Sequence, residues 1–64
     1  MNRLYELRKN KKLTQKECAE IAHISKKTYE RYEKGLRAIP ARILIAFYNY
    51  YKVSVDYILG LTDQ

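Results

Sequence analysis

Residues 14–34 read TQKECAEIAHISKKTYERYEK, and this stretch decides the fold. Thr14 is a good helix cap, and Glu17 three residues later completes the T-x-x-E pattern of a capping box. Ser25 is a good cap for a second helix. These signals predict helices over about residues 15–22 and 26–34, joined by a corner of only a few residues.

That corner needs one residue with left-handed backbone dihedrals, and glycine is the usual choice. Here His23 occupies the position. Histidine is among the non-glycine residues that adopt this conformation most readily. We therefore interpret the single histidine as the residue that supplies the left-handed backbone conformation of this corner. We expect neither a metal nor a cofactor, because a metal site needs several converging Cys, His or carboxylate ligands.

Three further helices, and no strand, are predicted outside this stretch. The first covers about residues 2–10. The fourth begins at Pro40 and ends near residue 51, with a buried stripe predicted from the i, i+3, i+4, i+7 spacing of Leu44, Phe47, Tyr48 and Tyr51. Ser54 caps a short fifth helix, and Gly60 ends it.

An apolar residue precedes each of the three caps, and another follows five positions later. Such pairs are typical of hydrophobic staples, which fix the angle at which the chain enters a helix. The predicted staples are Leu13/Cys18, Ile24/Tyr29 and Val53/Ile58.

The length of 64 residues predicts one domain, residues 1–64, folded as an all-α, compact five-helix bundle. The lone Cys18 cannot form an internal disulfide, which favours a reducing cytoplasm. No apolar run is long enough to span a membrane, and the charged N-terminus is not typical of a signal peptide. We expect a cytoplasmic protein with no membrane partner.

The positive charge is unevenly distributed. The chain has 13 Lys and Arg residues against 7 Asp and Glu, a net charge of +6. Ten of the basic residues lie between Arg8 and Arg37, where only four acidic residues are found. A basic half beside a neutral half indicates one surface that faces a polyanion. The alternative is an ordinary solvated surface, and composition alone favours neither.

Helical geometry divides the 26–34 helix into two faces. At about 100° per residue, Tyr29, Tyr32 and Glu33 lie on one side. Lys27, Arg31 and Lys34 lie nearly opposite, where we expect an exposed positive arc. Charge rows on helices are often plain solvated faces, but the caps, the corner and the localised charge favour a binding role.

Glu33 is expected on the side of the core, where an isolated carboxylate would be costly. Arg8 at the end of the first helix is the predicted partner in a structural ion pair. Glu30 lies beside the cations, where it could accept a hydrogen bond from cytosine N4 or merely repel misplaced phosphate; the sequence does not decide between the two.

The sequence resembles the Cro/phage-repressor type of helix-turn-helix, the XRE-like family. The matching residues are Leu13-Thr14-Gln15, Ala19, Ile24-Ser25, Tyr29, Tyr32, Glu33, Gly35 and the run VSVDYILG at residues 53–60. The resemblance implies a lambda-repressor-like helix-turn-helix domain, with the helix-turn-helix at about residues 15–34 and the recognition helix at about 26–34. It also implies binding of double-stranded DNA, commonly as a dimer on a palindromic operator. His23 departs from the family's usual glycine, and Cys18 replaces a large aliphatic residue.

On this resemblance, Lys26, Lys27 and Arg31 read base edges, Thr28 lies near the backbone or an edge, and Gln15 contacts phosphate. Arg31 is the best base reader on physical grounds, because its planar fork matches guanine O6 and N7. The full set of candidate phosphate contacts is Arg8, Lys12, Gln15, Ser25, Lys34, Arg37 and Arg42.

Seven tyrosines are more than so small a core can hold. Tyr29, Tyr32, Tyr48 and Tyr51 fit core or boundary positions. A patch of Ile45, Tyr50, Tyr57 and Leu61 could form a homodimer that sets two recognition helices one DNA turn apart. The alternative is that these tyrosines are amphipathic side chains at the edge of the helix bundle, with no role in self-association.

The leading hypothesis is a sequence-specific DNA-binding transcriptional regulator, of repressor type, that inserts its third helix into the major groove. A protein-interaction module, such as an antitoxin or a regulator-binding partner, is the alternative, because fold does not fix function. An enzyme is not expected, since the chain has one Cys, one His and no Gly-rich phosphate loop.

Overall fold

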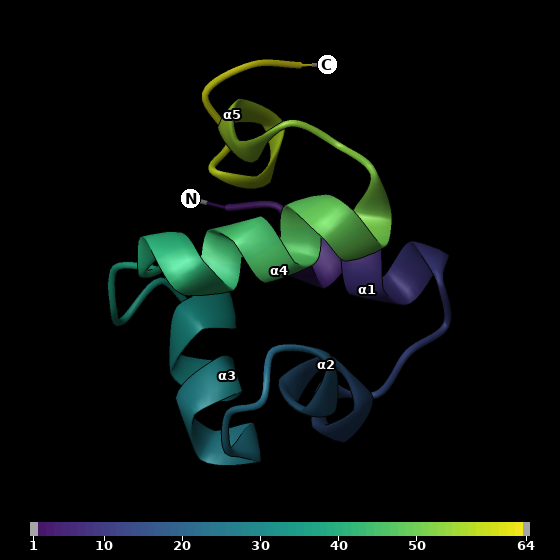
Figure 1. Cartoon of the computed structure of the whole chain (residues 1–64), viewed down its shortest axis with the longest axis vertical. Coiled ribbons are helices and arrows are strands. Elements are labelled where there is room, and N and C mark those ends of the chain that lie inside the picture. Colours follow the sequence, from purple (N-terminus) through teal and green to yellow (C-terminus); the bar gives the residue numbers. More distant parts are fainter. Residues whose placement is uncertain (1, 64) are drawn as a thin grey trace.

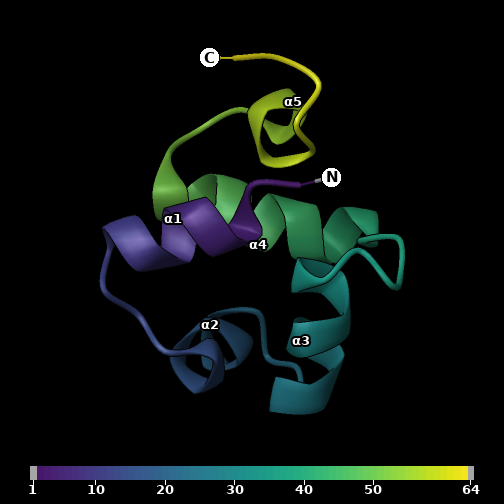
Figure 2. The same cartoon turned by 180° about the vertical axis from the view of Figure 1, so that it is seen from behind.

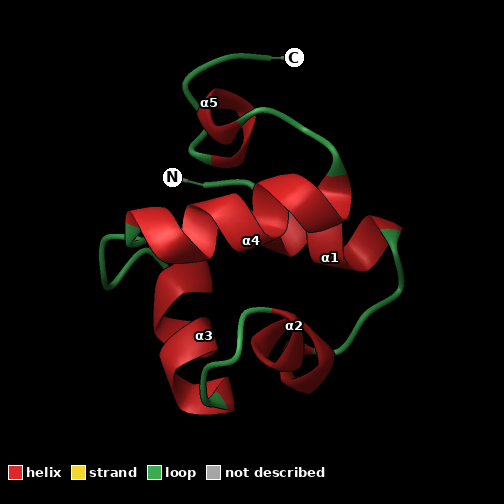
Figure 3. Ribbon diagram, in the orientation of Figure 1, coloured by secondary structure: helices red, strands yellow, loops and turns green. Residues whose placement is uncertain are grey.

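The computed structural model describes residues 2–63, so the first and last positions of the predicted domain lie outside the described residues. Within that part of the chain the fold is all-α, as predicted, with five helices and no strand (Figure 1, Figure 3). The helices are α1 (Leu4–Asn10), α2 (Gln15–Ile21), α3 (Lys26–Glu33), α4 (Ala41–Tyr51) and α5 (Val55–Ile58).

The helix ends differ from the predicted ones by at most two residues. Asn2 is not helical, and its side-chain oxygen accepts a hydrogen bond from the backbone N–H of Leu4, where α1 begins. Ala22 and Lys34, predicted as the last residues of α2 and α3, are instead their C-caps.

The helix-turn-helix occupies one end of the molecule. α4 crosses the middle, with α1 behind it in Figure 1 and in front of it in Figure 2. α2 and α3 lie on one side of this layer, and α5 lies on the other side with both ends of the described chain. The α2–α3 end is therefore free of the chain ends.

All five helices contribute to one core. Its largest fully buried side chains are Tyr29, Phe47, Leu4, Ile43, Ile58 and Cys18. The ring of Phe47 contacts Tyr29 edge-on, with centroids 5.9 Å apart, and stacks on Tyr51 at 5.8 Å. Cys18 Sγ lies 3.4 Å from the Tyr51 hydroxyl, so the large phenol reaches the space beside the small Cys18 side chain.

The predicted buried stripe of α4 is partly wrong. Phe47 and Tyr51 are buried, but Tyr48 is 49% exposed, and Ile43 takes the third core position. α4 carries apolar residues on almost every side, so its pattern fits more than one stripe. The observed stripe has the i, i+4, i+8 spacing, and it is the one that brings Phe47 against Tyr29.

The three predicted caps are confirmed. Thr14 Oγ1 accepts from the Glu17 N–H at 3.0 Å while a Glu17 carboxylate oxygen accepts from the Thr14 N–H at 2.8 Å, a complete capping box. Ser25 and Ser54 each cap at 3.1 Å. The apolar residues before the caps, Leu13, Ile24 and Val53, pack half-buried against the core, as staples require.

Four helices end in the same way. The residue after the C-cap is left-handed, and the next N–H bonds to the carbonyl five residues back, as in a Schellman motif. At these four helix ends the left-handed residues are Lys12, His23, Gly35 and Gly60. His23 has φ 57°, which confirms its predicted backbone role. Lys12 was not expected there, because lysine gives no signal for a left-handed residue.

Replacing His23 with glycine is expected to stabilise the fold by about 0.5–1 kcal/mol. The left-handed conformation costs a residue with Cβ about 1–2 kcal/mol, and glycine removes that cost but loses about 0.5–1 kcal/mol through its freer unfolded state. Urea unfolding measures the difference. His23→Ala is the matched control, since it removes the imidazole without relieving the backbone; a gain with alanine would contradict the explanation.

Candidate nucleic-acid interface

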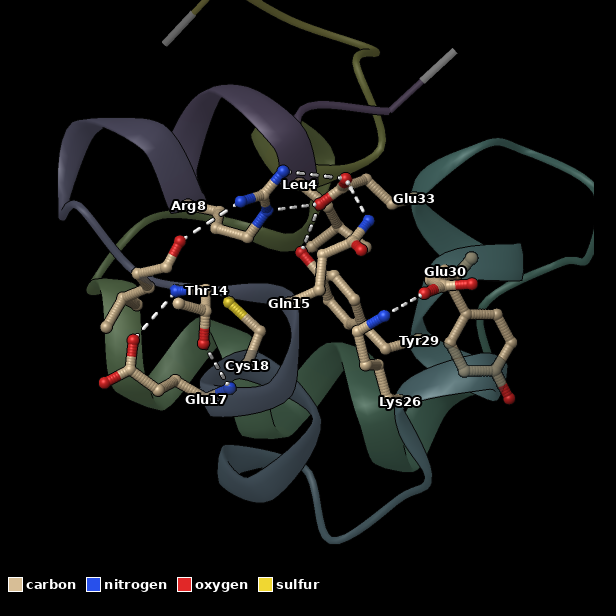
Figure 4. Close-up of polar contacts among 12 residues, drawn as sticks. Leu4, Arg8, Thr14, Gln15, Glu17, Cys18, Lys26, Tyr29, Glu30 and Glu33 are labelled. Atoms are coloured by element: carbon tan, nitrogen blue, oxygen red, sulfur yellow. Dashed lines mark hydrogen bonds and ion pairs between the residues drawn. The ribbon is translucent and has the colours of Figure 1, made fainter.

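A buried carboxylate joins the three helices behind the candidate binding face. One oxygen of Glu33 accepts from Arg8 Nε and from the Tyr29 hydroxyl, each at 2.8 Å. The other accepts from Arg8 Nη2 at 3.2 Å and from Gln15 Nε2 at 3.1 Å (Figure 4). α1, α2 and α3 each supply at least one member of this Glu33 network.

The network keeps Glu33 ionised although its side chain is only 6% exposed. Burial alone would raise the pKa of the carboxyl group. Hydrogen bonds from Arg8, Tyr29 and Gln15 outweigh that effect and hold the pKa of Glu33 below its ordinary value. The same bond to Glu33, opposed by desolvation, raises the pKa of Arg8. The pair is therefore charged at every pH at which the domain is expected to act.

Arg8 is held in a structural position. Its side chain is 12% exposed, and its third engaged nitrogen, Nη1, donates to the carbonyl of Leu13 at 3.1 Å. The guanidinium also lies 5.2 Å from the centre of the Tyr5 ring. The predicted ion pair with Glu33 is thus present. These contacts use three of the five guanidinium N–H groups, so the phosphate contact expected for Arg8 stays a prediction.

Gln15 is shared between the core and the surface. One N–H of its amide donates to Glu33, which leaves the second N–H for a phosphate. Ser25 is similarly engaged, because its hydroxyl accepts from the backbone N–H of Thr28 and donates to the Thr28 hydroxyl at 2.9 Å. A phosphate contact by Ser25 would require its hydroxyl hydrogen to turn away from Thr28.

The outer face of α3 carries the positive arc expected from the sequence. Lys27, Arg31 and Lys34 are exposed, while Tyr29 and Tyr32 on the opposite face are buried. Lys26 at the first position of α3 is also exposed, but its ammonium group is bound to Glu30, with Nζ and the carboxylate oxygen 2.6 Å apart. Thr28 is half-buried.

Three further candidates for phosphate contacts are exposed at positions outside α3. Lys12 lies in the connection between α1 and α2, Arg37 follows α3, and Arg42 lies in the first turn of α4. Helix N-termini and flanking cations are common phosphate contacts in protein–DNA complexes.

The proposed dimer patch is not uniform. Ile45, Tyr50 and Leu61 are exposed, and the Tyr50 ring packs edge-on against Tyr51 at 5.2 Å. Tyr57 differs, because it is half-buried beneath the Arg3 guanidinium, 4.6 Å from its ring centre. Tyr57 therefore offers less contact surface than the sequence suggested.

The sequence reasoning missed several contacts at this site. The Tyr29 hydroxyl and the Gln15 amide bond to Glu33, and Lys26 bonds to Glu30. The Tyr29–Glu33 and Lys26–Glu30 pairs have the i, i+4 spacing at which helical side chains meet, so a scan for that spacing would have found these two.

Within residues 2–63, no three His, Cys, Asp or Glu side chains converge as a metal site would need. No helix of that part of the chain is long and apolar enough to cross a membrane.

The fold and the exposed cationic helix define a helix-turn-helix domain. A family model described as "Helix-turn-helix domain" matches residues 1–64. The chain is 48% identical over 62 residues to the uncharacterized HTH-type transcriptional regulator YobD of Bacillus subtilis (strain 168), covering 97% of this chain and 55% of that protein. It is 40% identical over 58 residues to the HTH-type transcriptional regulator ImmR of the same organism, covering 91% of this chain and 46% of that protein.

The chain belongs to the XRE-like helix-turn-helix family of DNA-binding domains. It spans about half the length of the curated relatives it matches. No solved structure matches it.

Proposed function

We propose that this chain is the DNA-binding domain of a transcriptional repressor and inserts α3 into the major groove of double-stranded DNA. The observation that carries the proposal is the exposed arc of Lys27, Arg31 and Lys34 on a helix whose opposite face is buried and locked by the Glu33 network. A rigid helix with free cations suits major-groove entry. The two relatives are both named HTH-type transcriptional regulators, which supports the broader role of transcriptional regulation.

The contacts divide into two groups. Base edges are read from α3 by Lys26, Lys27, Thr28 and Arg31. Phosphates are contacted from the surrounding elements, which fixes the orientation of α3 on the duplex. The proposed phosphate contacts are Arg8, Lys12, Gln15, Ser25, Lys34, Arg37 and Arg42.

The proposal includes a homodimer on a palindromic operator. Two copies must then place their α3 helices about 34 Å apart, one turn of DNA. The exposed Ile45, Tyr50 and Leu61, with part of Tyr57, are the candidate contacts. Sedimentation at micromolar concentration, with and without operator, tests this; a 1:1 complex on a two-fold operator would exclude the dimer.

Arg31→Ala is expected to cost about 1–3 kcal/mol of binding on the operator and to relax the preference at one base pair. The operator is first selected from a random duplex library. Fluorescence titrations with operator and scrambled duplex, each at several salt concentrations, then measure the change.

Lys12→Ala and Arg37→Ala are the matched controls, because each removes one exposed cation without touching α3. They should weaken binding to both duplexes alike, and the salt dependence of binding should fall by about one released counterion. Equal losses on both duplexes for Arg31→Ala would show that Arg31 contacts phosphate and does not read a base.

A second candidate function is protein interaction, for example as an antitoxin or a regulator-binding partner. The observation in its favour is that Ile45, Tyr48 and Tyr50 are exposed on α4. A partner lost with Tyr50→Ala and retained with Arg31→Ala would support it.

A further inference from the structure

The recognition helix carries an anion among its cations. Glu30 accepts a hydrogen bond from Lys26 at 2.6 Å, and Lys27 and Lys34 lie near enough to add to its field. The bond from Lys26 is the main reason that the pKa of Glu30 is held below its ordinary value. The side chains are 56% (Lys26) and 30% (Glu30) exposed, so the pair is open to a ligand (Figure 4).

Helix stability is a weak explanation for this pair. An i, i+4 ion pair is more favourable when the acid precedes the base, and here Lys26 precedes Glu30. Lys26 also occupies the first position of α3, where the helix dipole disfavours a cation, and the first turn contains no acidic residue. Helix stability alone would favour the opposite order.

Phosphate binding does not explain it either. An anion on the DNA-facing helix lowers the attraction to every duplex, because nonspecific affinity depends on neutralised phosphates. Glu30 also occupies one of the hydrogen-bonding positions of the Lys26 ammonium group. Discrimination between bases is a role that uses both members of the pair.

The pair presents a donor and an acceptor side by side. In the major groove, a G·C pair shows the O6 acceptor of guanine next to the N4 amino donor of cytosine, and a T·A pair shows the O4 acceptor of thymine next to the N6 donor of adenine. Within each base pair, the keto oxygen and the amino group are hydrogen-bonded to each other, at the ordinary N–H···O length of about 2.9 Å. The distance between Lys26 Nζ and the Glu30 carboxylate oxygen, 2.6 Å, is close to this value.

We propose that Lys26 and Glu30 read one base pair of the operator as a unit, with Lys26 donating to the keto oxygen of one base and Glu30 accepting from the amino group of its partner. The proposal rests on the proposed function and names Glu30 as a specificity-determining residue of that site. Both protein groups keep their own hydrogen bond while they bind, since an ammonium group has three donors and a carboxylate several acceptor sites.

The unit discriminates by orientation. With G on the strand that Lys26 faces and C on the other, both contacts form, and guanine N7 offers Lys26 a second acceptor. T·A also satisfies both contacts but lacks that acceptor on the same base. When the pair is reversed, Lys26 faces an amino group and Glu30 faces a keto oxygen, so both contacts are repulsive. The expected order is G·C, then T·A, with C·G and A·T rejected.

Operator selection from a random duplex library, carried out in parallel for the wild-type domain and three variants, tests this. At one position in each half-site, the wild type should prefer a duplex with the keto base (G or T) on the strand that Lys26 faces. The preference over the duplex with that base pair reversed should be about tenfold or more. Glu30→Gln, whose amide can offer either a donor or an acceptor, should reduce this preference about tenfold. Lys26→Ala should act at the same position, and the double variant should lose no more than the stronger single variant.

Glu20→Gln is the matched control, because it removes an exposed glutamate charge from α2. It should raise affinity for all duplexes slightly and change no preference. A preference is a ratio between duplexes bound by one protein sample, so a change in the folded fraction leaves it unaltered. If Glu30→Gln behaves like Glu20→Gln, or if Lys26 and Glu30 affect different positions, the proposal is wrong. If the wild type enriches no sequence at all, the proposed function itself fails.

Discussion

Replacing Glu33 with alanine is expected to lower the free energy of unfolding by about 3–5 kcal/mol, the usual cost of removing one partner from a buried ion pair. The carboxylate accepts four hydrogen bonds, and its loss leaves the guanidinium of Arg8, 12% exposed, without its counter-ion. The Tyr29 hydroxyl loses its acceptor as well. A domain of this size has little stability to lose. The variant should therefore show a thermal unfolding midpoint far below that of the wild type, measured by circular dichroism.

Glu30→Ala is the matched control for this change. It removes the same charge from the same helix, but the Lys26–Glu30 pair is exposed, so we expect little change in the thermal unfolding midpoint. A double-mutant cycle then isolates the ion pair. Arg8→Met combined with Glu33→Leu should cost less than Glu33→Ala alone, because no buried charge is left behind. Simple additivity in that cycle would contradict a coupled pair.

The features that were predictable from the sequence depend on neighbouring residues. The caps at Thr14, Ser25 and Ser54 join groups three residues apart, so the sequence alone specifies them. His23 could be assigned a left-handed backbone because a short helix corner needs one such residue and histidine is among the non-glycine residues that adopt it most readily. The helix order and the two faces of α3 follow from these caps and from helical periodicity.

The features that were not predictable depend on packing between distant segments. The rotation of α4 is set by the contact between Phe47 and Tyr29, 18 positions apart, and the apolar pattern of α4 alone allowed Tyr48 to be placed inside. Tyr57 is covered by Arg3 from the other end of the chain. Lys12 takes a left-handed conformation for which its side chain gives no sign.

The candidate site contains one exception. Arg8 and Glu33 are 25 positions apart, yet their pairing was predicted, because a carboxylate on the core side of α3 needs a cation and the family resemblance points to the same pair. The part played by Gln15 was not, since the direction of its amide is decided only when α2 and α3 meet. Which of the exposed cations contact bases stays a prediction until DNA binding is measured.

Alkaline unfolding is expected to be steep, because the pKa values of two core tyrosines are raised in the folded state. Burial raises the pKa of Tyr29, and its hydrogen bond to Glu33 raises it further. Burial and the contact with Cys18 also raise the pKa of Tyr51. In the unfolded chain both phenols titrate near pH 10. Above that pH the unfolded state binds fewer protons than the folded state, so stability falls as pH rises.

Each such phenol contributes up to about 1.4 kcal/mol per pH unit once the unfolded phenols are ionised, and the two together should remove about 2 kcal/mol between pH 10 and 11, where that ionisation is still being completed. The stability is fully present below about pH 10, and urea unfolding at closely spaced pH values measures its loss. Tyr51→Phe should halve the slope, because one proton is no longer released on unfolding. Tyr48→Phe, which alters an exposed phenol of the same helix, should leave the slope unchanged. Equal slopes for the two variants would show that Tyr51 ionises freely in the folded domain, and that the core around Phe47 and Cys18 admits water.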